Sequence, residues 1–475
     1  MTQDRAMEDL HCDVAVIGAG TAGLAAERAA RRAGASTVLI DDRFSGTTCA
    51  SVGCMPSKLL IAAAHAAHAV RTAAIFGVTV PAPTIDGAAV MARVRLERDR
   101  FVAGTKASFG HLPDGVAVRA TARFVDATTL ALDDGRKVHA RAIVIATGSR
   151  PMVPPMFTAL GDRALTNETI FELPTLPSSI AVIGAGAIGL ELAQALARLD
   201  VAVTVFDTGT RIGGVKDAAV EPVLRDLLAR ELDFVLGVTV EATRDGDGVM
   251  LSWTGDSEGQ RRYDKVLVAV GRPPALNGLG LDATGLECDN RGTPLFDPAT
   301  MQCGDSTIFI AGDADASRAV LHEASDEGAI AGRNAARYPD VVAVDRGVPF
   351  TITFTDPPVA VIGAPAGDDT VIGDACYADQ GRAKVEARNA GLARIYADPG
   401  DGRLTGAVMA ASGMDHAAHL IAWAVARGET ATTLLDLPFY HPTLEEGLKP
   451  ALRAICKAVH APVGSDADRG IPAGA

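Results

Sequence analysis

The chain has 475 residues, of which 48% are hydrophobic and 21% are charged, and its formal net charge is −14. At about 100–200 residues per domain, this length predicts about three domains with sizeable cores. The negative charge disfavours nucleic acid and anionic membrane surfaces as partners. We find no apolar run approaching the roughly 18 residues of a membrane span. The polar start of the chain lacks the pattern of a secretion signal, which predicts a cytoplasmic protein.

The first predicted element is a strand, turn, helix and second strand over residues 14–41. Its sequence, VAVIGAGTAGLAAERAARRAGASTVLID, carries the pattern G-x-G-x-x-G at Gly18, Gly20 and Gly23. These glycines permit a tight turn, a close approach of pyrophosphate and close packing of helix on strand. The helix N-terminus offers N–H groups to phosphate, and Asp41 ends the second strand where an acid binds a ribose hydroxyl. The unit predicts a dinucleotide site, with a purely structural glycine turn as the alternative.

The next segment, SGTTCASVGCMPSK, holds two cysteines close in sequence, Cys49 and Cys54. A regular helix would separate them by a rise of about 7.5 Å, whereas a disulfide needs Cα atoms roughly 4.4–6.8 Å apart. The backbone is therefore predicted to be irregular, which Gly53 permits, and Pro56 suits the first turn of the following helix. A helix N-terminus and Lys58 would favour thiolate. We interpret the cysteines as a redox pair; the alternative is two buried thiols that never pair.

The other cysteines are scattered singly, and no cluster around them has a zinc-binding pattern. They are predicted to be buried or inert. They are Cys12, Cys288, Cys303, Cys376 and Cys456.

A second copy of the first unit spans residues 180–207 and aligns with it without a gap. Its sequence, IAVIGAGAIGLELAQALARLDVAVTVFD, places glycines at Gly184, Gly186 and Gly189 and an acid at Asp207. Two complete copies predict two bound dinucleotide cofactors.

Three apolar strands ending in glycine turns accompany these units. Arg141–Pro151 and Asp264–Pro274 each follow one unit and are predicted to end the sheet of its domain. Ser306–Asp315 ends in Gly312 and Asp313. Asp313 is interpreted as a turn residue or as a carboxylate that binds a ligand hydroxyl at the carboxyl end of a parallel strand.

The last motif is FYHPTLEEGL, which contains His441 and Glu446. Thr443 and Glu446 have the spacing of a capping box that opens a helix. Alternatively, His441 is the general acid/base for thiol chemistry and Glu446 orients its ring. Both interpretations of Glu446 stay open at this stage.

The cysteine motif resembles that of the class I pyridine nucleotide–disulfide oxidoreductases, a family that includes dihydrolipoamide dehydrogenase, glutathione reductase and mercuric reductase. The resemblance covers nearly the whole chain, including both glycine units, the ATG and VGR turns, LHEASDEG and HPTLEE. It implies an α/β fold with two Rossmann-like domains, for FAD and NAD, and a C-terminal α+β dimerisation domain. The implied domains are an FAD-binding domain in two segments, 1–150 and 276–345, an NAD-binding domain, 151–275, and a dimerisation domain, 346–475.

The resemblance also implies roles for individual residues. Cys49 would exchange with substrate sulfur, Cys54 would face the flavin, and Lys58 would lie near the flavin and pair with Glu191. His441 and Glu446, supplied by the partner of a homodimer, would complete the site. The implied cofactor-binding residues are Gly18, Gly20, Gly23, Asp41, Thr48, Thr147, Gly148, Asp313, Leu321, His322, Gly184, Gly186, Gly189, Asp207 and Gly271.

Two positions depart from the family pattern, because Thr47 and Asp200 replace glycines. Ser57 in CMPSK matches lipoamide and mercuric enzymes better than glutathione reductase, and Asp207 favours NAD over NADP. A mercuric reductase should carry a C-terminal cysteine pair, whereas Cys456 stands alone. Dihydrolipoamide dehydrogenase, acting on a lipoyl-domain protein or a small dithiol or disulfide, is the preferred hypothesis. The alternatives are another disulfide or metal-ion reductase, an NADH oxidase and a redox-sensing flavoprotein.

Overall fold

The computed structural model describes residues 8–462. The chain divides into two compact units, each built from three stretches of sequence. Unit 1 comprises Met1–Leu59, Ala92–Met152 and Gly271–Arg346; unit 2 comprises Leu60–Met91, Val153–Val270 and Gly347–Ala475. The four domain segments expected from the sequence stay a prediction.

Unit 1 is built on a sheet of order β3-β2-β1-β6-β5-β4, with β15 also paired to β6. In β1, Val14 and Val16 pack on one face of the sheet while Ala15 and Ile17 pack on the other, as period-two alternation requires. The parallel strands are β1 (Leu10–Ile17), β2 (Thr37–Asp41), β3 (Ala117–Arg119), β6 (Lys137–Ile145) and β15 (Ile308–Ile310); β4 (Ala122–Phe124) and β5 (Thr129–Leu132) are antiparallel.

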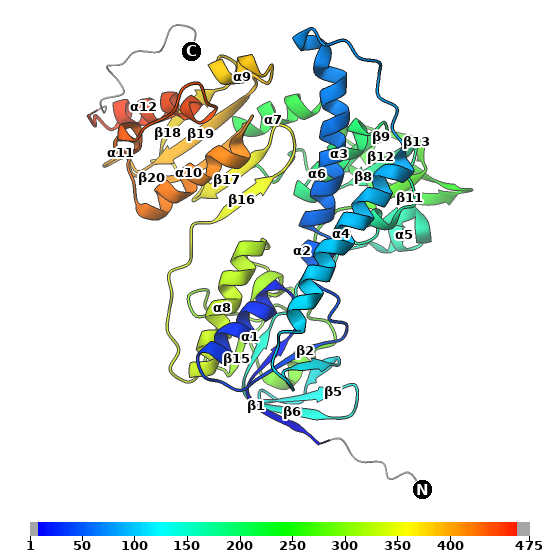
Figure 1. Cartoon of the computed structure of the whole chain (residues 1–475), viewed down its shortest axis with the longest axis vertical. Coiled ribbons are helices and arrows are strands. Elements are labelled where there is room, and N and C mark those ends of the chain that lie inside the picture. Colours follow the sequence, from blue (N-terminus) through cyan, green and yellow to red (C-terminus); the bar gives the residue numbers. More distant parts are fainter. Residues whose placement is uncertain (1–7, 463–475) are drawn as a thin grey trace. The chain divides into compact units, whose positions relative to one another are not determined.

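Helices α1 (Thr21–Arg32) and α8 (Leu321–Arg337) lie side by side in unit 1 (Figure 1). Glycines on α8 make this close packing possible. A Cβ at Gly328 would lie 2.2 Å from the carbonyl oxygen of Ala22, and one at Gly332 would lie 2.1 Å from that of Ala26. Any larger residue at these positions would push the helices apart.

Unit 2 contains the second glycine unit in a parallel sheet of order β10-β9-β8-β14-β7. An antiparallel three-stranded sheet, β11-β12-β13, packs beside it through a shared apolar core. The strands are β7 (Ala164–Leu165), β8 (Ser179–Ile183), β9 (Ala202–Asp207), β10 (Asp233–Leu236), β11 (Val238–Asp245), β12 (Gly248–Gly255), β13 (Gly259–Tyr263) and β14 (Lys265–Val268); the helices are α5 (Pro155–Thr158), α6 (Ala187–Arg198) and α7 (Val220–Leu228).

The C-terminal part of unit 2 is an antiparallel sheet of order β16-β17-β20-β19-β18 covered by helices. Together with the two dinucleotide-type sheets, it confirms the expected α/β class with a C-terminal α+β region. Its elements are β16 (Phe350–Thr353), β17 (Val359–Gly363), β18 (Val371–Cys376), α9 (Gly381–Val385), β19 (Gly391–Ala397), β20 (Leu404–Ala411), α10 (Met414–Arg427), α11 (Ala431–Asp436) and α12 (Lys449–Ala458).

The strands expected to end the two dinucleotide sheets occupy interior positions instead. β6 lies between β1 and β5, and β14 lies between β8 and β7. The order of the strands in sequence does not determine this arrangement, because β5 and β7, on the far sides of β6 and β14, both come earlier in the chain.

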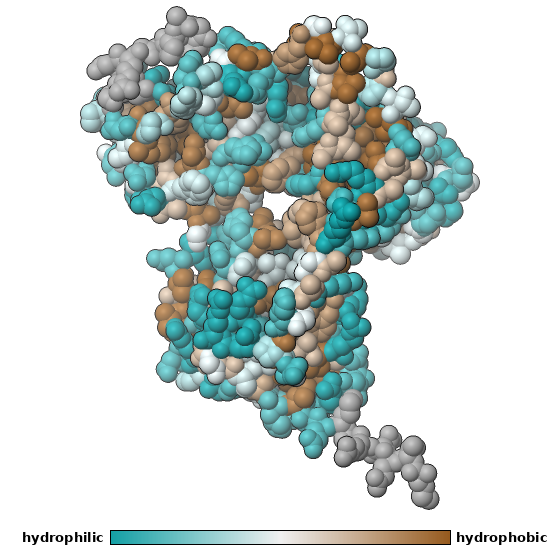
Figure 2. Space-filling model, viewed as in Figure 1, coloured by the Kyte–Doolittle hydropathy of each residue, from teal (hydrophilic) through white to brown (hydrophobic). Residues whose placement is uncertain are grey.

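The helical run Thr48–Phe76 corrects the expectation that no segment is apolar enough to cross a membrane. It comprises α2 (Thr48–Ser51), α3 (Cys54–Thr72) and a 3₁₀ turn, and by length and composition it meets the criterion for a span. Alanines supply much of its apolar character, together with Leu59, Leu60 and Ile61. A single such helix is weak support for membrane insertion, since core helices also meet the criterion. Figure 2 shows hydrophobic residues along α3, and Ile75 and Phe76 just beyond it are 65% and 58% exposed.

Candidate active site

The first glycine turn has the geometry that its sequence predicts. Gly18 has φ +104°, and a Cβ there would lie 2.4 Å from the carbonyl oxygen of Ala146. A Cβ at Gly23 would lie 1.8 Å from the carbonyl oxygen of Gly18, so this position packs the helix on the turn. Gly20 faces open space, with nothing within 4 Å of its Cβ position, which leaves room for a pyrophosphate.

The second glycine turn repeats these contacts almost atom for atom. Gly184 has φ +110° and would place a Cβ 2.4 Å from the carbonyl oxygen of Ala269; at Gly189 the Cβ would lie 2.0 Å from that of Gly184. Nothing lies within 4 Å of the Cβ position of Gly186. The two copies therefore offer the same cradle at the N-termini of α1 and α6.

Each of the acids that end β2 and β9 accepts a hydrogen bond from the glycine turn of its own copy. Asp41 accepts hydrogen bonds from the backbone N–H of Ala19 at 2.9 Å and of Phe44 at 2.7 Å. Asp207 accepts equivalent bonds from Ala185 and Gly209, both at 2.7 Å. Carboxylate oxygens accept more than one hydrogen bond, so both groups retain capacity for a ribose hydroxyl.

The ATG turn lies against Asp313 in unit 1. The Ser149 hydroxyl donates to Asp313 Oδ2 at 2.7 Å, and Arg272 Nε donates to the same hydroxyl at 3.1 Å. Thr147 Oγ1 is buried without a hydrogen-bond partner among residues 8–462. Ser149 and Arg272 are polar residues of the site that we did not select from the sequence, although both stand in the quoted turns.

Other expected cofactor residues also lie at chain reversals or helix starts. Gly148 and Gly271 adopt φ +70° and +129°, which favours glycine. Leu321 and His322 are the first two residues of α8, whose N-cap, Val320, provides no side-chain cap. The start of α8 thus directs backbone N–H groups outward, as expected for the LHEASDEG segment.

The cysteine segment is irregular, as the spacing predicts. Cys49 lies in α2, and the chain turns at Val52 and Gly53 before α3 begins at Cys54. The turn leaves little room at Gly53, because a Cβ there would lie 3.0 Å from the carbonyl oxygen of Thr48. Thr47, the departure from the family's glycine, caps α2 by accepting a hydrogen bond from the N–H of Ala50.

The two thiols form one hydrogen-bonded pair. Cys49 is half-buried and Cys54 is exposed. The hydrogen bond with Cys54, followed by burial, raises the pKa of Cys49, while the positive charge of Lys58 opposes this shift. Both the hydrogen bond and burial favour the protonated form of Cys49.

Glu191 lies on α6 in unit 2, where it is 8% exposed and accepts a hydrogen bond from the N–H of Phe354 at 2.8 Å. Lys58 lies on α3, one turn after Cys54. Their expected pairing stays a prediction. Asp200, the second departure from glycine, adopts φ +66° and binds Arg71 at 2.6 Å, so an acid replaces glycine in a left-handed cap.

The remaining cysteines divide by location. Cys303 and Cys456 are fully buried, and burial raises the pKa of Cys303 to about 12. Cys12 is half-buried. Cys288 and Cys376 are exposed, so burial is excluded for these two and their inertness stays a prediction: Cys376 ends the edge strand β18, and Cys288 lies in a loop.

His441 and Glu446 form the pair expected from the C-terminal motif. His441 Nδ1 lies 3.0 Å from Glu446 Oε1 and 3.2 Å from Oε2. Glu446 also accepts a hydrogen bond from the N–H of Thr443, but the Thr443 hydroxyl donates to the carbonyl oxygen of Tyr440. Only half of the capping box therefore forms. Glu446 both orients the imidazole and satisfies a backbone donor.

Comparison with known proteins places these features in one family. Residues 12–328 match the model of pyridine nucleotide-disulphide oxidoreductases, and residues 349–452 match the dimerisation domain of the same family. The chain is 31% identical to mercuric reductase of Streptomyces lividans, over 94% of the chain and 97% of that protein. It is also 31% identical to dihydrolipoyl dehydrogenase of Bacillus subtilis (strain 168), over 94% of the chain and 100% of that protein.

Solved structures show the same fold. LpdA from Mycobacterium tuberculosis aligns with a TM-score of 0.80 at 24% identity, covering 93% of this chain and 99% of that one. The flavoprotein disulfide reductase RclA from Escherichia coli, solved as a Cu(II) complex, aligns with a TM-score of 0.80 at 21% identity and the same coverage.

FAD and NAD are the cofactors of this family, and the residues present fit them. Each glycine turn leaves an open cradle at a helix N-terminus, and the buried hydroxyl of Thr147 lacks a partner within the described residues. The sequence match, both cradles and the cysteine pair lead to one conclusion: the chain belongs to the pyridine nucleotide-disulphide oxidoreductase family.

Proposed function

We propose that the chain is an NAD-dependent dihydrolipoyl dehydrogenase that oxidises dihydrolipoyl groups through a Cys49–Cys54 disulfide. The observation that carries this proposal is the His441–Glu446 pair, with Nδ1 and Oε1 3.0 Å apart. A thiol substrate needs a base, whereas a flavin oxidase that reacts with oxygen alone does not. The carboxylate fixes Nδ1 and leaves Nε2 to take the proton.

In this reaction, His441 removes a proton from one thiol of the dihydrolipoyl group. The thiolate attacks Cys49 Sγ, the Cys49–Cys54 bond breaks, and Cys54 leaves as thiolate. The second substrate thiol then attacks the mixed disulfide and closes the lipoyl ring; its proton passes to the leaving Cys49 sulfur, so Cys49 is released as thiol. Lys58 adds positive charge near the pair. FAD and NAD⁺, when bound, would supply the acceptors for the two electrons that the pair has gained.

The cofactor sites in this proposal are the two glycine cradles. Gly18, Gly20, Gly23 and Asp41 would hold FAD together with Thr147 and Asp313. The cradle at Gly184, Gly186, Gly189 and Asp207 would hold NAD. Arg211, the cation nearest in sequence to Asp207, donates to the carbonyl oxygen of Lys216, which supports NAD rather than a 2′-phosphorylated cofactor.

A metal-ion reductase is the second candidate, because relatives at equal identity are named mercuric reductases. The C-terminal region argues against mercury as substrate. From residue 349 onward it contains two cysteines, Cys376 and Cys456, which are 80 positions apart, and Cys456 is fully buried. They supply no adjacent pair to deliver a metal ion.

Steady-state assays of the FAD-loaded enzyme would separate these candidates. We expect the highest kcat/KM with lipoamide and the NAD(H) couple, compared with glutathione disulfide and Hg²⁺, each with NADH and NADPH. Cys54→Ser should abolish lipoamide turnover while FAD stays bound, whereas the exposed-thiol control Cys376→Ser should match wild type. Preference for Hg²⁺ or glutathione disulfide would refute the proposed substrate.

The dimerisation domain supports a homodimer, in which a partner subunit is available to complete the active site. We propose that His441 serves the cysteines of the partner subunit across a two-fold interface. Mixing inactive Cys49→Ser with inactive His441→Gln protein under subunit exchange should restore one intact site in each heterodimer. Absence of lipoamide turnover in purified heterodimers would assign His441 to the cysteines of its own chain.

A further inference from the structure

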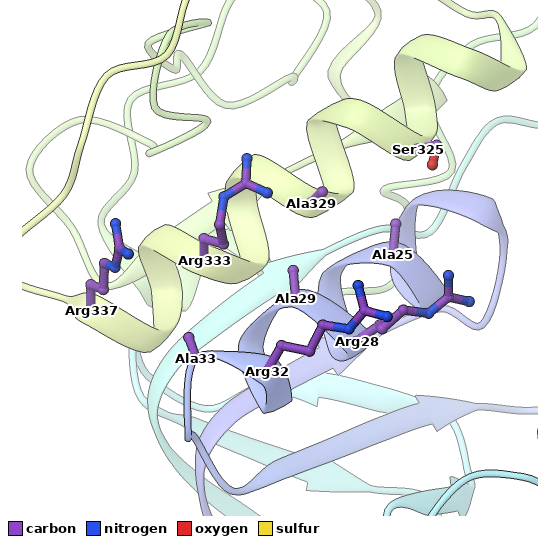
Figure 3. Close-up of a pocket in the computed structure, with 9 residues that line it drawn as sticks. All are labelled: Ala25, Arg28, Ala29, Arg32, Ala33, Ser325, Ala329, Arg333 and Arg337. Carbon is purple, nitrogen blue, oxygen red and sulfur yellow. The ribbon is translucent and has the colours of Figure 1, made fainter.

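A groove of about 310 Å³ lies between α1 and α8, apart from the residues assigned to the cofactors. Arginines from both helices line it: Arg28 and Arg32 from α1, and Arg333 and Arg337 from α8. Figure 3 shows small side chains, including Ala29 and Ala329, in the space between the helices and the arginines along either side. The result is a basic groove with a shallow apolar floor.

The charges of this groove are not neutralised within the described chain. Between residues 8 and 462, none of the four guanidinium groups takes part in an ion pair or a side-chain hydrogen bond. The neighbouring Arg31 behaves differently, since it binds Glu27 at 2.7 Å. Four uncompensated positive charges in one groove are unexpected in a chain whose net charge is −14.

In the second glycine unit, other parts of the chain cover the equivalent face of α6, and their contacts show what this face binds. In the gapless alignment, Ala25, Arg28 and Arg32 of α1 correspond to Glu191, Gln194 and Arg198 of α6. Arg198 binds the carboxylates of Glu231 at 2.6 Å and Asp356 at 2.9 Å, and it is 5% exposed.

Gln194 completes this contact by donating to the carbonyl oxygen of Asp356 at 2.8 Å. In the second copy, protein oxygens therefore satisfy the polar groups of this face. In the first copy the equivalent face is open, and α8 adds two further arginines to it.

The spacing of the charges favours a compact ligand. Each helix presents its two arginines four residues apart, a rise of about 6 Å. A linear oligophosphate carries several negative charges within a comparable span, whereas an acidic peptide distributes one charge per residue on flexible stems. The guanidinium fork binds phosphate oxygens in a bidentate manner, and all four cations are arginine rather than lysine.

We propose that the α1–α8 groove binds an oligophosphate, either a free inorganic chain or the phosphate tail of a nucleotide. The ligand would take the place that Glu231 and Asp356 occupy against α6. The site is separate from the glycine cradles, so its occupancy requires no redox step.

Isothermal titration of the FAD-loaded enzyme with tripolyphosphate tests this site, with saturating NAD⁺ present to fill the second cradle. We expect saturable binding that weakens as NaCl increases. Arg28→Gln/Arg32→Gln and Arg333→Gln/Arg337→Gln should each raise Kd about tenfold or more. The control Arg230→Gln/Arg291→Gln removes the same charge from exposed positions elsewhere and should leave Kd unchanged.

A parallel titration with ATP identifies the source. Equal affinities would support recognition of the phosphate chain alone, and tighter ATP binding would support a nucleotide. Unchanged flavin absorbance and circular dichroism in each variant exclude misfolding. The proposal is overturned if tripolyphosphate and ATP do not bind saturably, if the groove variants bind as wild type does, or if a hexa-aspartate peptide binds the groove while both phosphate compounds fail.

Discussion

The two glycine units have nearly identical inner faces, where the helix packs on the glycine turn. They differ in their outer faces, where α1 and α6 pack against other parts of the chain. Inside, the third glycine of each copy would place a Cβ 1.8 Å or 2.0 Å from the carbonyl oxygen of the first. Outside, α1 packs on α8 through Gly328 and Gly332, whereas α6 binds the segment Phe354–Asp356 through polar side chains. The fingerprint thus determines the phosphate cradle, while the rest of the helix selects its neighbour.

The largest expected effect comes from the third glycines, where the copies are most alike. Gly23→Ala should abolish FAD binding, because the new Cβ overlaps a backbone oxygen of the cradle. Gly189→Ala should retain FAD but lose reduction by NADH. Flavin absorbance of purified protein and stopped-flow mixing with NADH measure the two effects. If Gly189→Ala protein lacks FAD, the assignment of one cofactor to each copy is wrong.

The next prediction compares how much the outer faces of α6 and α1 contribute to stability. Arg198→Ala should lower the free energy of unfolding by about 3–5 kcal/mol, because it leaves Glu231 and Asp356 without their buried partner. Arg32→Ala, at the equivalent position of α1, should change it by less than about 0.5 kcal/mol. Denaturant unfolding of the FAD-loaded proteins gives both values. Equal losses would show that the outer faces do not differ in this way.

A pH-dependent effect should appear around α8, which the second copy lacks. Burial and the charge of Asp315 raise the pKa of Glu327 to about 8. Its protonated form is therefore favoured in the folded state, and stability should fall as pH rises from about 4.5 to about 8. Glu327→Gln should remove this loss, which we expect to be on the order of a few kcal/mol. Thermal unfolding across this pH range tests the sign, and a wild type that gains stability over the mutant with rising pH would contradict it.

The smallest effect concerns the acids that end β2 and β9. Asp207→Ala should shift the ratio of kcat/KM for NADH over NADPH about tenfold toward NADPH, since it removes the carboxylate that disfavours a 2′-phosphate. Asp41→Ala should leave this ratio unchanged, although FAD binding weakens. Steady-state kinetics with both cofactors provides the comparison. A shift in the Asp41 variant would mean that the two acids do not serve separate cofactors.

The sequence by itself determined the features that depend on neighbouring residues. The glycine spacing predicted both cradles, because turn geometry and the N-terminus of a helix are local properties. The separation of Cys49 and Cys54 predicted the irregular backbone, since a helical rise leaves them too far apart. The family followed from the same motifs, and the match over residues 12–328 confirms it.

Only the tertiary structure decided what depends on contacts between distant residues. Ser149 meets Asp313 across 164 positions, and Arg198 meets Asp356 across 158. The interior places of β6 and β14 likewise depend on which elements pack together. The α1–α8 groove has the same origin: each helix presents an ordinary pair of arginines one turn apart, and the four charges gather because glycines on α8 let the two helices approach closely.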